Sequence, residues 1–170
     1  MNYKRCMYYV EGKCEEQLIN VLKAEPRRLT PGKVKVHNII QKEIPRREVN
    51  MIGQGTTVVF VYDTDVEKTD ILMKNIEHVM KYAAQTKIVH MAQVRNFEDE
   101  IVRSTDVKKV QDLTRSKSVS DFKTDFCRMK IQECRNALER HHLDISILWS
   151  KKPPKAFDSV KQGGDTVKLS

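Results

Sequence analysis

The sequence predicts an α/β fold, with a mostly parallel sheet flanked by helices and a helical extension toward the C-terminal end. Two observations predict it. Short apolar runs rich in β-branched and aromatic residues alternate with longer segments in which apolar residues recur at helical spacing. The length of 170 residues is that of one ordinary domain, large enough to bury a core without disulfides or metals.

The alternation of strand and helix patterns covers the first half of the chain. Loops between the patterns are marked by prolines and glycines. The second strand is short, and whether it continues to Ile39 and Ile40 is left open by the pattern. We expect strands at 6–10, 34–36, 56–62 and 87–92, and helices at 15–24 and 66–84.

Beyond residue 96 the pattern changes to short helices that would cap one edge of the sheet. We expect these helices at 97–103, 107–113, 118–129 and 132–141. The lysine, proline and glycine content of the C-terminal end indicates an extended, flexible tail. The expected organisation is an α/β core at 1–95, a helical extension of the same domain at 96–150, and a flexible basic tail at 151–170.

Composition excludes a membrane protein. Hydrophobic residues make up 39% and charged residues 32%, and the sequence holds no apolar run of the roughly 18 residues that a spanning helix needs. The N-terminus lacks the apolar core and cleavage site of a secretory signal, so we expect a cytoplasmic protein. The 4 cysteines form no Cys-x-x-Cys pair, and we expect reduced thiols rather than a zinc site.

The net charge of +8 is unevenly distributed along the chain. Only the block at 51–100 carries more acidic than basic residues. An acidic centre in a basic chain suits a metal site that must also attract a polyanion such as nucleic acid. The alternative is that the excess charge serves solubility alone.

The first acidic motif follows the first strand. Glu11 and Gly12 stand at the strand end, where glycine allows a sharp turn and leaves the carboxylate over the sheet edge. Glu15 lies four residues later, so a helix that begins near Gly12 would bring both carboxylates to one side. The alternative for Glu15, and the better account of Glu16, is a favourable interaction with the helix N-terminal dipole.

The second acidic motif is Asp63-Thr64-Asp65, directly after the most apolar strand. Because side chains alternate along an extended chain, the two aspartates are expected on the same side. The alternative is that Asp65 caps the following helix.

These motifs should meet in space, since ligands of open parallel sheets bind at the carboxyl edge of the strands. Crowded carboxylates repel one another unless a cation neutralises them, and Mg²⁺ prefers oxygen ligands. The sequence therefore predicts a site for Mg²⁺, or Mn²⁺, formed by Glu11, Glu15, Asp63 and Asp65. Two such ions could activate water and stabilise a leaving oxygen on a phosphodiester.

The spacing of Val10-Glu11-Gly12-Lys13-Cys14-Glu15 and Asp63-Thr64-Asp65 resembles the TOPRIM domain of topoisomerases, primases and small nucleases. The resemblance covers roughly residues 5–95 and is nearest to the nuclease branch, the OLD-family and RloB-like proteins of phage-defence loci. It implies a Rossmann-like core, Mg²⁺ and phosphodiester hydrolysis.

The same resemblance implies a later acidic residue and a lysine. Glu98 or Glu100 and Lys117 stand at the matching places, which would make Glu98 a metal ligand and Lys117 a catalytic residue. OLD-family proteins add an ATPase domain that this chain does not carry, so nucleotide-driven control would come from a separate protein or complex subunit.

Basic residues between the two acidic motifs are candidates for contact with the phosphate backbone. A second basic group, which includes Lys117 and Lys123, falls on the C-terminal helices and could line the opposite wall. A solvated surface is the alternative for both. The candidate nucleic-acid-binding residues are Arg27, Arg28, Lys33, Lys35, Arg46 and Arg47.

The leading hypothesis is a Mg²⁺-dependent TOPRIM-type nuclease acting on DNA or RNA, with a place in phage defence. The competing hypothesis is a non-catalytic subunit that binds nucleic acid or assists assembly of a larger complex. A phosphatase or nucleotidyl transferase fits less well, because its Asp-x-Asp normally follows the first strand.

Overall fold

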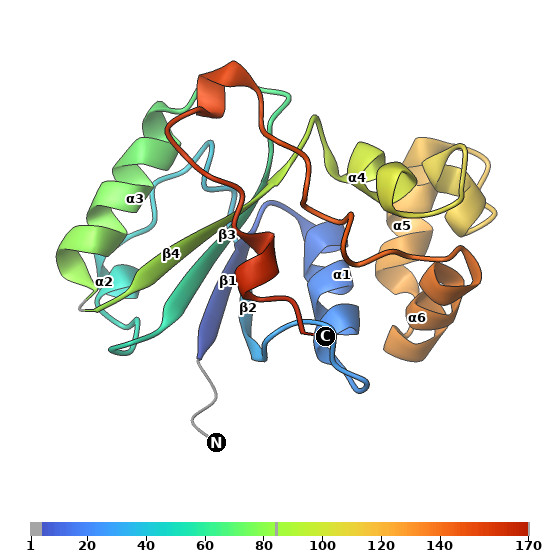
Figure 1. The fold of residues 1–170 in the computed structure, drawn as a ribbon, viewed down its shortest axis with the longest axis horizontal. Helices are drawn as coiled ribbons and strands as arrows, with labels where there is room; N and C mark the ends of the chain where they lie inside the picture. Colours follow the sequence, from blue (N-terminus) through green and yellow to red (C-terminus); the bar gives the residue numbers. More distant parts are fainter. Residues whose placement is uncertain (1–4, 84, 170) are drawn as a thin grey trace.

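The computed structural model describes residues 5–83 and 85–169. Within these residues the sheet has four strands, all parallel, in the order β2-β1-β3-β4 (Figure 1). The strands are β1 (Cys6–Val10), β2 (Gly32–Val36), β3 (Thr57–Asp63) and β4 (Lys87–Gln93). The predicted α/β fold with a parallel sheet is confirmed, and the predicted strands lie within a few residues of the observed ones.

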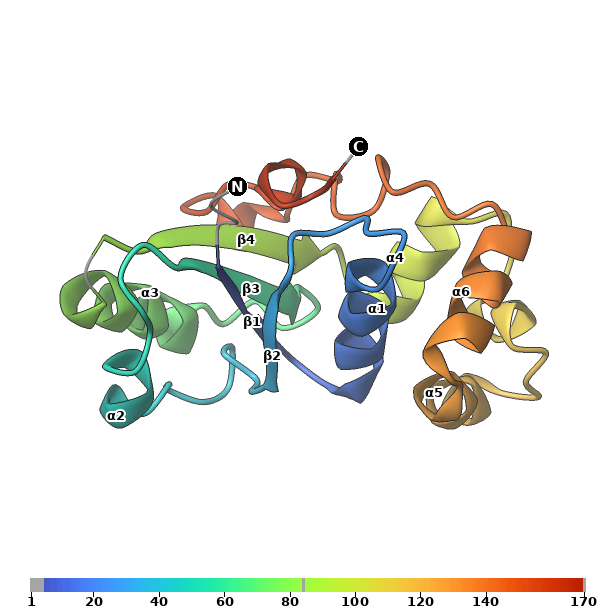
Figure 2. The ribbon, with the colours of Figure 1, turned by 90° about the horizontal axis from the view of Figure 1, so that it is seen from below.

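Helices cover both faces of the sheet (Figure 2). On one face lie α1 (Lys13–Lys23), α4 (Phe97–Ser104), α5 (Val119–Arg128) and α6 (Ile131–Arg140). On the other lie α3 (Asp70–Tyr82) and the short α2 (Arg46–Val49). The expected helical extension thus packs on the core, since both α5 and α6 contact α1.

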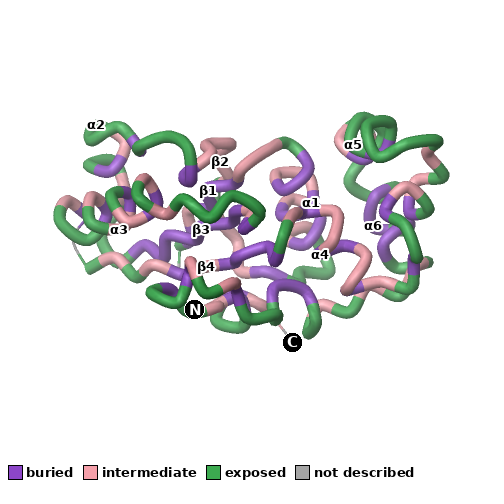
Figure 3. The backbone as a smooth tube through the Cα atoms, turned by 90° about the horizontal axis from the view of Figure 1, so that it is seen from above, coloured by how far each residue is buried: buried purple, intermediate pink, exposed green. Residues whose placement is uncertain are grey.

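Side-chain alternation along the strands supplies one hydrophobic core to each face. Tyr8 and Val10 of β1 pack with the core under α1, whereas Tyr9 packs with Phe60 and Val79 under α3. The residues of β3 are almost wholly buried, which explains the nearly uninterrupted apolar pattern of a central parallel strand. Figure 3 shows this burial along the central strands, with exposed backbone in the outer loops.

The most informative differences from the prediction concern three segments. The strand predicted at 34–36 begins earlier, at Gly32, and ends at Val36, so Ile39 and Ile40, which the pattern left open, are buried in the turn that follows. The helix predicted at 66–84 begins at Asp70 and ends at Tyr82, and residue 84 lies outside the described residues.

The third difference is in the segment predicted to be a helix at 107–113, which forms only the 3₁₀ turn η1 (Val110–Leu113). Val107 and Val110 are nevertheless buried, so the apolar positions serve the core without a full helix.

The C-terminal segment 151–169 is packed on the fold and is not the flexible tail expected from its composition; residue 170 lies outside the described residues. It contains the 3₁₀ turns η2 (Lys155–Phe157) and η3 (Gly164–Thr166). Phe157 stacks on Tyr62 with ring centroids 5.9 Å apart. Gln162 bonds both the N–H and the C=O of Ala92 on β4, at 2.8 and 2.7 Å. Scattered apolar and amide side chains therefore anchor a basic segment along the sheet (Figure 1).

No helix among residues 5–83 and 85–169 is long and apolar enough to cross a membrane.

Candidate functional site

Three strand ends bring polar side chains to the carboxyl edge of the sheet. Glu11 follows β1, Asp63 ends β3, and Gln93 ends β4. Glu11 Oε2 accepts a hydrogen bond from the backbone N–H of Asp63 at 3.0 Å, although the two residues are 52 positions apart. Glu11 Oε1 accepts a second bond, from the side-chain amide of Asn38 at 2.8 Å. The two acidic motifs therefore meet as predicted from the parallel arrangement of the strands.

The amide of Gln93 joins the remaining carboxylates. Its Nε2 donates to Asp63 Oδ1 at 2.5 Å and to Glu15 Oε1 at 3.1 Å. Glu15 reaches this point because α1 begins at Lys13, directly after the turn at Gly12. A Cβ atom at Gly12 would stand 3.1 Å from Glu15 Oε2, so glycine leaves the room that this carboxylate occupies.

Burial and mutual repulsion raise the pKa values of the three acids. Burial is the largest cause for Asp63, whose pKa rises to about 8, and the charges of Glu11, Glu15 and Asp65 raise it further. Burial likewise raises the pKa of Glu11 and of Glu15, against the lowering effect of their hydrogen bonds. Asp63 therefore holds a proton at neutral pH when no cation is near.

The three acids open onto a hollow of about 460 Å³, which we call the acidic hollow. Its other wall is formed by α4 and α5, where Glu98 and Lys123 form an ion pair of 2.7 Å. Its lining comprises Glu11, Gly12, Lys13, Cys14, Glu15, Asp63, Phe97, Glu98, Lys123, Thr124 and Cys127.

Some predicted site residues lie elsewhere. Asp65 is exposed beyond the end of β3 and does not line the hollow, although its charge acts on Glu11 and Asp63. Lys117 is exposed in the loop before α5, whereas Lys123, another member of the second basic group, lines the hollow. Glu98 lines the hollow, whereas its alternative Glu100 is buried in an ion pair with Arg103.

The donor set suits a hard cation, because it consists of carboxylate and amide oxygens. Among the described residues no donor reaches the buried Gln93 Oε1, which leaves one acceptor unused beside the acids. Within the same residues, no group of three or more His, Cys, Asp and Glu side chains is arranged as a ready-made metal site. The carboxylate oxygens instead accept N–H groups from Gln93, Asn38 and the Asp63 backbone. The chemistry of the oxygens therefore fits Mg²⁺, while their present orientation serves hydrogen bonds.

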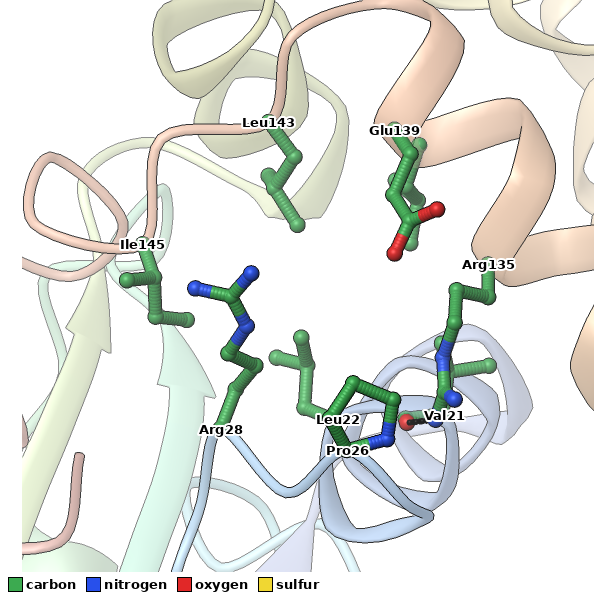
Figure 4. Close-up of a pocket in the computed structure, with 9 residues that line it drawn as sticks. Val21, Leu22, Pro26, Arg28, Arg135, Glu139, Leu143 and Ile145 are labelled. Atoms are coloured by element: carbon green, nitrogen blue, oxygen red, sulfur yellow. Dashed lines mark hydrogen bonds between the residues drawn. The ribbon is translucent and has the colours of Figure 1, made fainter. Parts of the chain in front are cut away.

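The six basic residues predicted to bind nucleic acid are all described by the structure, and none of them lines the acidic hollow. Arg28 points into a small hollow between the end of α1 and α6, with Glu139 on the opposite side of that hollow (Figure 4). Arg27 pairs with Glu25, and Lys35 pairs with Glu48 at 2.5 Å.

The remaining three are also spread out. Lys33 lies on β2 beside Lys35, and both line a separate apolar groove with Met51. Arg46 lies over the ring of Tyr82 at 4.3 Å, and Arg47 is exposed on α2. The basic residues therefore do not form one surface around the acids.

Sequence reasoning missed Gln93 and Asn38, which orient the acids, and named Lys123 only as one member of a basic group that could line the opposite wall. Only the position of Gln93 at the end of a predicted strand could have indicated it. Comparison with family models, with curated proteins and with solved structures found no match for this chain.

Proposed function

We propose that the protein is a Mg²⁺-dependent, or Mn²⁺-dependent, nuclease of TOPRIM type that hydrolyses phosphodiester bonds in DNA or RNA. The observation that carries the proposal is the convergence of Glu11, Glu15 and Asp63 on one another through Gln93 and the Asp63 amide. Burying three acids together raises their pKa values, and a divalent cation offsets that repulsion.

In this proposal Glu11, Glu15 and Asp63 hold the cation, and Glu98 completes the acidic wall. A bound divalent ion supplies an acidified water and stabilises negative charge on a phosphodiester. Asp65 adds negative charge at the rim, which favours cation capture. Lys123 and Lys13 line the same hollow and attract the phosphate that the carboxylates would otherwise repel.

A second candidate function is supported by the placement of the basic residues. Because they lie away from the acids, the protein could bind nucleic acid or a larger complex without cleaving it. In that case the acidic hollow would take a cation for assembly. The nuclease proposal itself includes a separate ATPase or complex subunit as a partner, with a role in phage defence in the cytoplasm.

Cleavage assays separate the two candidates. Supercoiled plasmid, single-stranded DNA and tRNA are incubated with the protein in Mg²⁺ or Mn²⁺, with EDTA as the blank. Asp63→Asn and Glu11→Gln keep the side-chain shapes and remove the charges. Asp158→Asn is the matched control, because Asp158 is exposed and does not line the hollow. Loss of cleavage in Asp63→Asn and Glu11→Gln, with cleavage retained in Asp158→Asn, supports the nuclease.

Two results would contradict it. Cleavage that persists in both charge-removing variants would place the chemistry elsewhere. No cleavage of any polymer, together with unchanged nucleic-acid retention in both variants, would favour the binding subunit.

A further inference from the structure

Two cysteines meet in the wall of the acidic hollow. Cys14 lies in the first turn of α1 and Cys127 in the last turn of α5, and their Sγ atoms are 3.3 Å apart. The two residues are 113 positions apart, so tertiary packing of the helices creates the contact. A disulfide bond is about 2.05 Å long, so the sulfurs need to approach by only about 1.2 Å to be joined.

We propose that Cys14 and Cys127 form a site of reversible thiol oxidation, at which a peroxide joins them into a disulfide that ties α1 to α5. The proposal is independent of the nuclease activity, because it requires only the thiols and the oxidant. The modified cysteines line the same hollow as Glu15 and Lys123.

The oxidation takes place in two balanced steps. Cys127 is half-buried and Cys14 is buried, so Cys127 meets the peroxide first. Its sulfur attacks one peroxide oxygen and the O–O bond breaks, which gives a sulfenic acid and water. The Cys14 sulfur then attacks the Cys127 sulfur, the S–O bond breaks, and a second water leaves. Two thiols are oxidised and one hydrogen peroxide is reduced to two waters.

Proximity favours the second step over further oxidation of Cys127. The Cys14 thiol is buried, which makes it the less accessible thiol toward free peroxide. As the resolving partner it needs no diffusion, because its sulfur already contacts that of Cys127. Its thiol points at α5 in any case, since Sγ also approaches the Lys123 carbonyl at 3.8 Å.

The other cysteines are less suited to this reaction. Cys6 begins β1, at the opposite end of that strand from Glu11. Cys134 is fully buried on α6, and its pKa is raised by this burial and, to a lesser extent, by the nearby Cys127. Cys134 is therefore the competitor for Cys127 that an experiment must exclude.

The disulfide would fix the width of the acidic hollow on one side. The α5 helix carries Lys123, which pairs with Glu98 in the wall formed by α4 and α5. The α1 helix carries Glu15. A covalent link between the two helices next to these residues holds the lysine and the carboxylates at one separation.

Thiol counting and peptide mapping test the proposal. The folded protein is treated with hydrogen peroxide in EDTA, quenched, and analysed without reductant. We expect free thiols to fall from four to two, the intact mass to fall by two hydrogens, and a cross-linked peptide containing positions 14 and 127 to appear. Dithiothreitol should restore four thiols.

Serine variants supply the controls. Cys134→Ser should still form the link, whereas Cys14→Ser and Cys127→Ser should not, with circular dichroism confirming that each is folded. Four remaining thiols under conditions that fully oxidise glutathione would overturn the proposal. So would a link between positions 127 and 134, or a sulfinic acid at Cys127 in the unsubstituted protein. These readouts do not change if the protein proves to have no nuclease activity.

Discussion

Gln93 donates its side-chain N–H to Asp63 over 2.5 Å, and the two residues are register partners at the ends of β4 and β3. The same nitrogen also reaches Glu15. A single neutral amide therefore holds the buried Glu15 and the half-buried Asp63 in place, where repulsion would otherwise push them apart.

Replacement of Gln93 by leucine should destabilise the protein. The change leaves Glu15 and Asp63 without their shared donor, and an unsatisfied buried acceptor costs about 1–3 kcal/mol. Urea unfolding monitored by circular dichroism measures the loss in the free energy of unfolding. Gln132→Leu on the exposed side of α6 is the matched control, expected within about 0.5 kcal/mol of the unsubstituted protein. Equal effects of the two changes would contradict the role given to Gln93.

Asp63→Asn should stabilise the metal-free protein at pH 8. The pKa of Asp63 is about 8 in the fold against an ordinary value of 3.8, so between these values the folded state binds more protons than the unfolded state. The free energy of unfolding therefore falls as pH rises through this window. Asparagine carries no such charge, and its advantage should grow from pH 4 to 8 to on the order of 1–3 kcal/mol.

Unfolding in EDTA at several pH values measures this difference. An advantage that is equal at pH 4 and pH 8 would show that burial of Asp63 does not perturb its titration.

Cation binding should strengthen as pH rises toward 8. A divalent ion binds the ionised carboxylate, so it must displace the proton that Asp63 holds below its pKa of about 8. Titration calorimetry with Mn²⁺ in buffers of different ionisation enthalpy should detect one proton released per ion near pH 7. In Asp63→Asn that release should disappear. Binding that is insensitive to pH would remove Asp63 from the ligand set.

Lys123→Ala should reduce cleavage by about tenfold or more, because a cation beside a reacting phosphate stabilises developing charge. Lys117→Ala is the comparison, since Lys117 lies outside the hollow lining and should have little effect. Rates are compared at saturating Mg²⁺, with thermal unfolding as the check on folding. A larger loss of cleavage in Lys117→Ala than in Lys123→Ala would support Lys117, the lysine that the TOPRIM resemblance implies.

Phe157→Ala should lower the free energy of unfolding by about 3 kcal/mol. Phe157 is buried and stacks on Tyr62, and truncation of a buried aromatic ring leaves a cavity. Lys155→Ala, in the same 3₁₀ turn but exposed, is the control. A small effect of Phe157→Ala would mean that the segment 151–169 contributes little to stability, as its composition suggests.

The main elements could be predicted because their patterns are local. The apolar run of β3 and the helical spacing in α1 identify these elements directly, and the parallel arrangement places Glu11 near Asp63. Gln93 carries no comparable pattern, since a neutral amide after a strand belongs to no metal or catalytic motif. Its role arises only when the ends of β3 and β4 and the first turn of α1 come together in the fold.

The position of Lys123 and the packing of the C-terminal segment depend on tertiary structure. Lys123 reaches the hollow only because α5 packs on α1, and sequence distance from the acidic motifs does not reveal this. In the C-terminal segment, Phe157 and Val167 are buried but follow no helical or strand period. Composition alone therefore suggested flexibility where the edge of β4 provides a binding partner for Gln162.

Because β1 lies between β2 and β3, the backbones that carry Glu11 and Asp63 are joined by a ladder at the centre of the sheet. A fluctuation that parts them must break this ladder and expose both hydrophobic cores. Separation of the two strand ends then requires global unfolding of the domain, and slow hydrogen exchange at the Asp63 amide would report it.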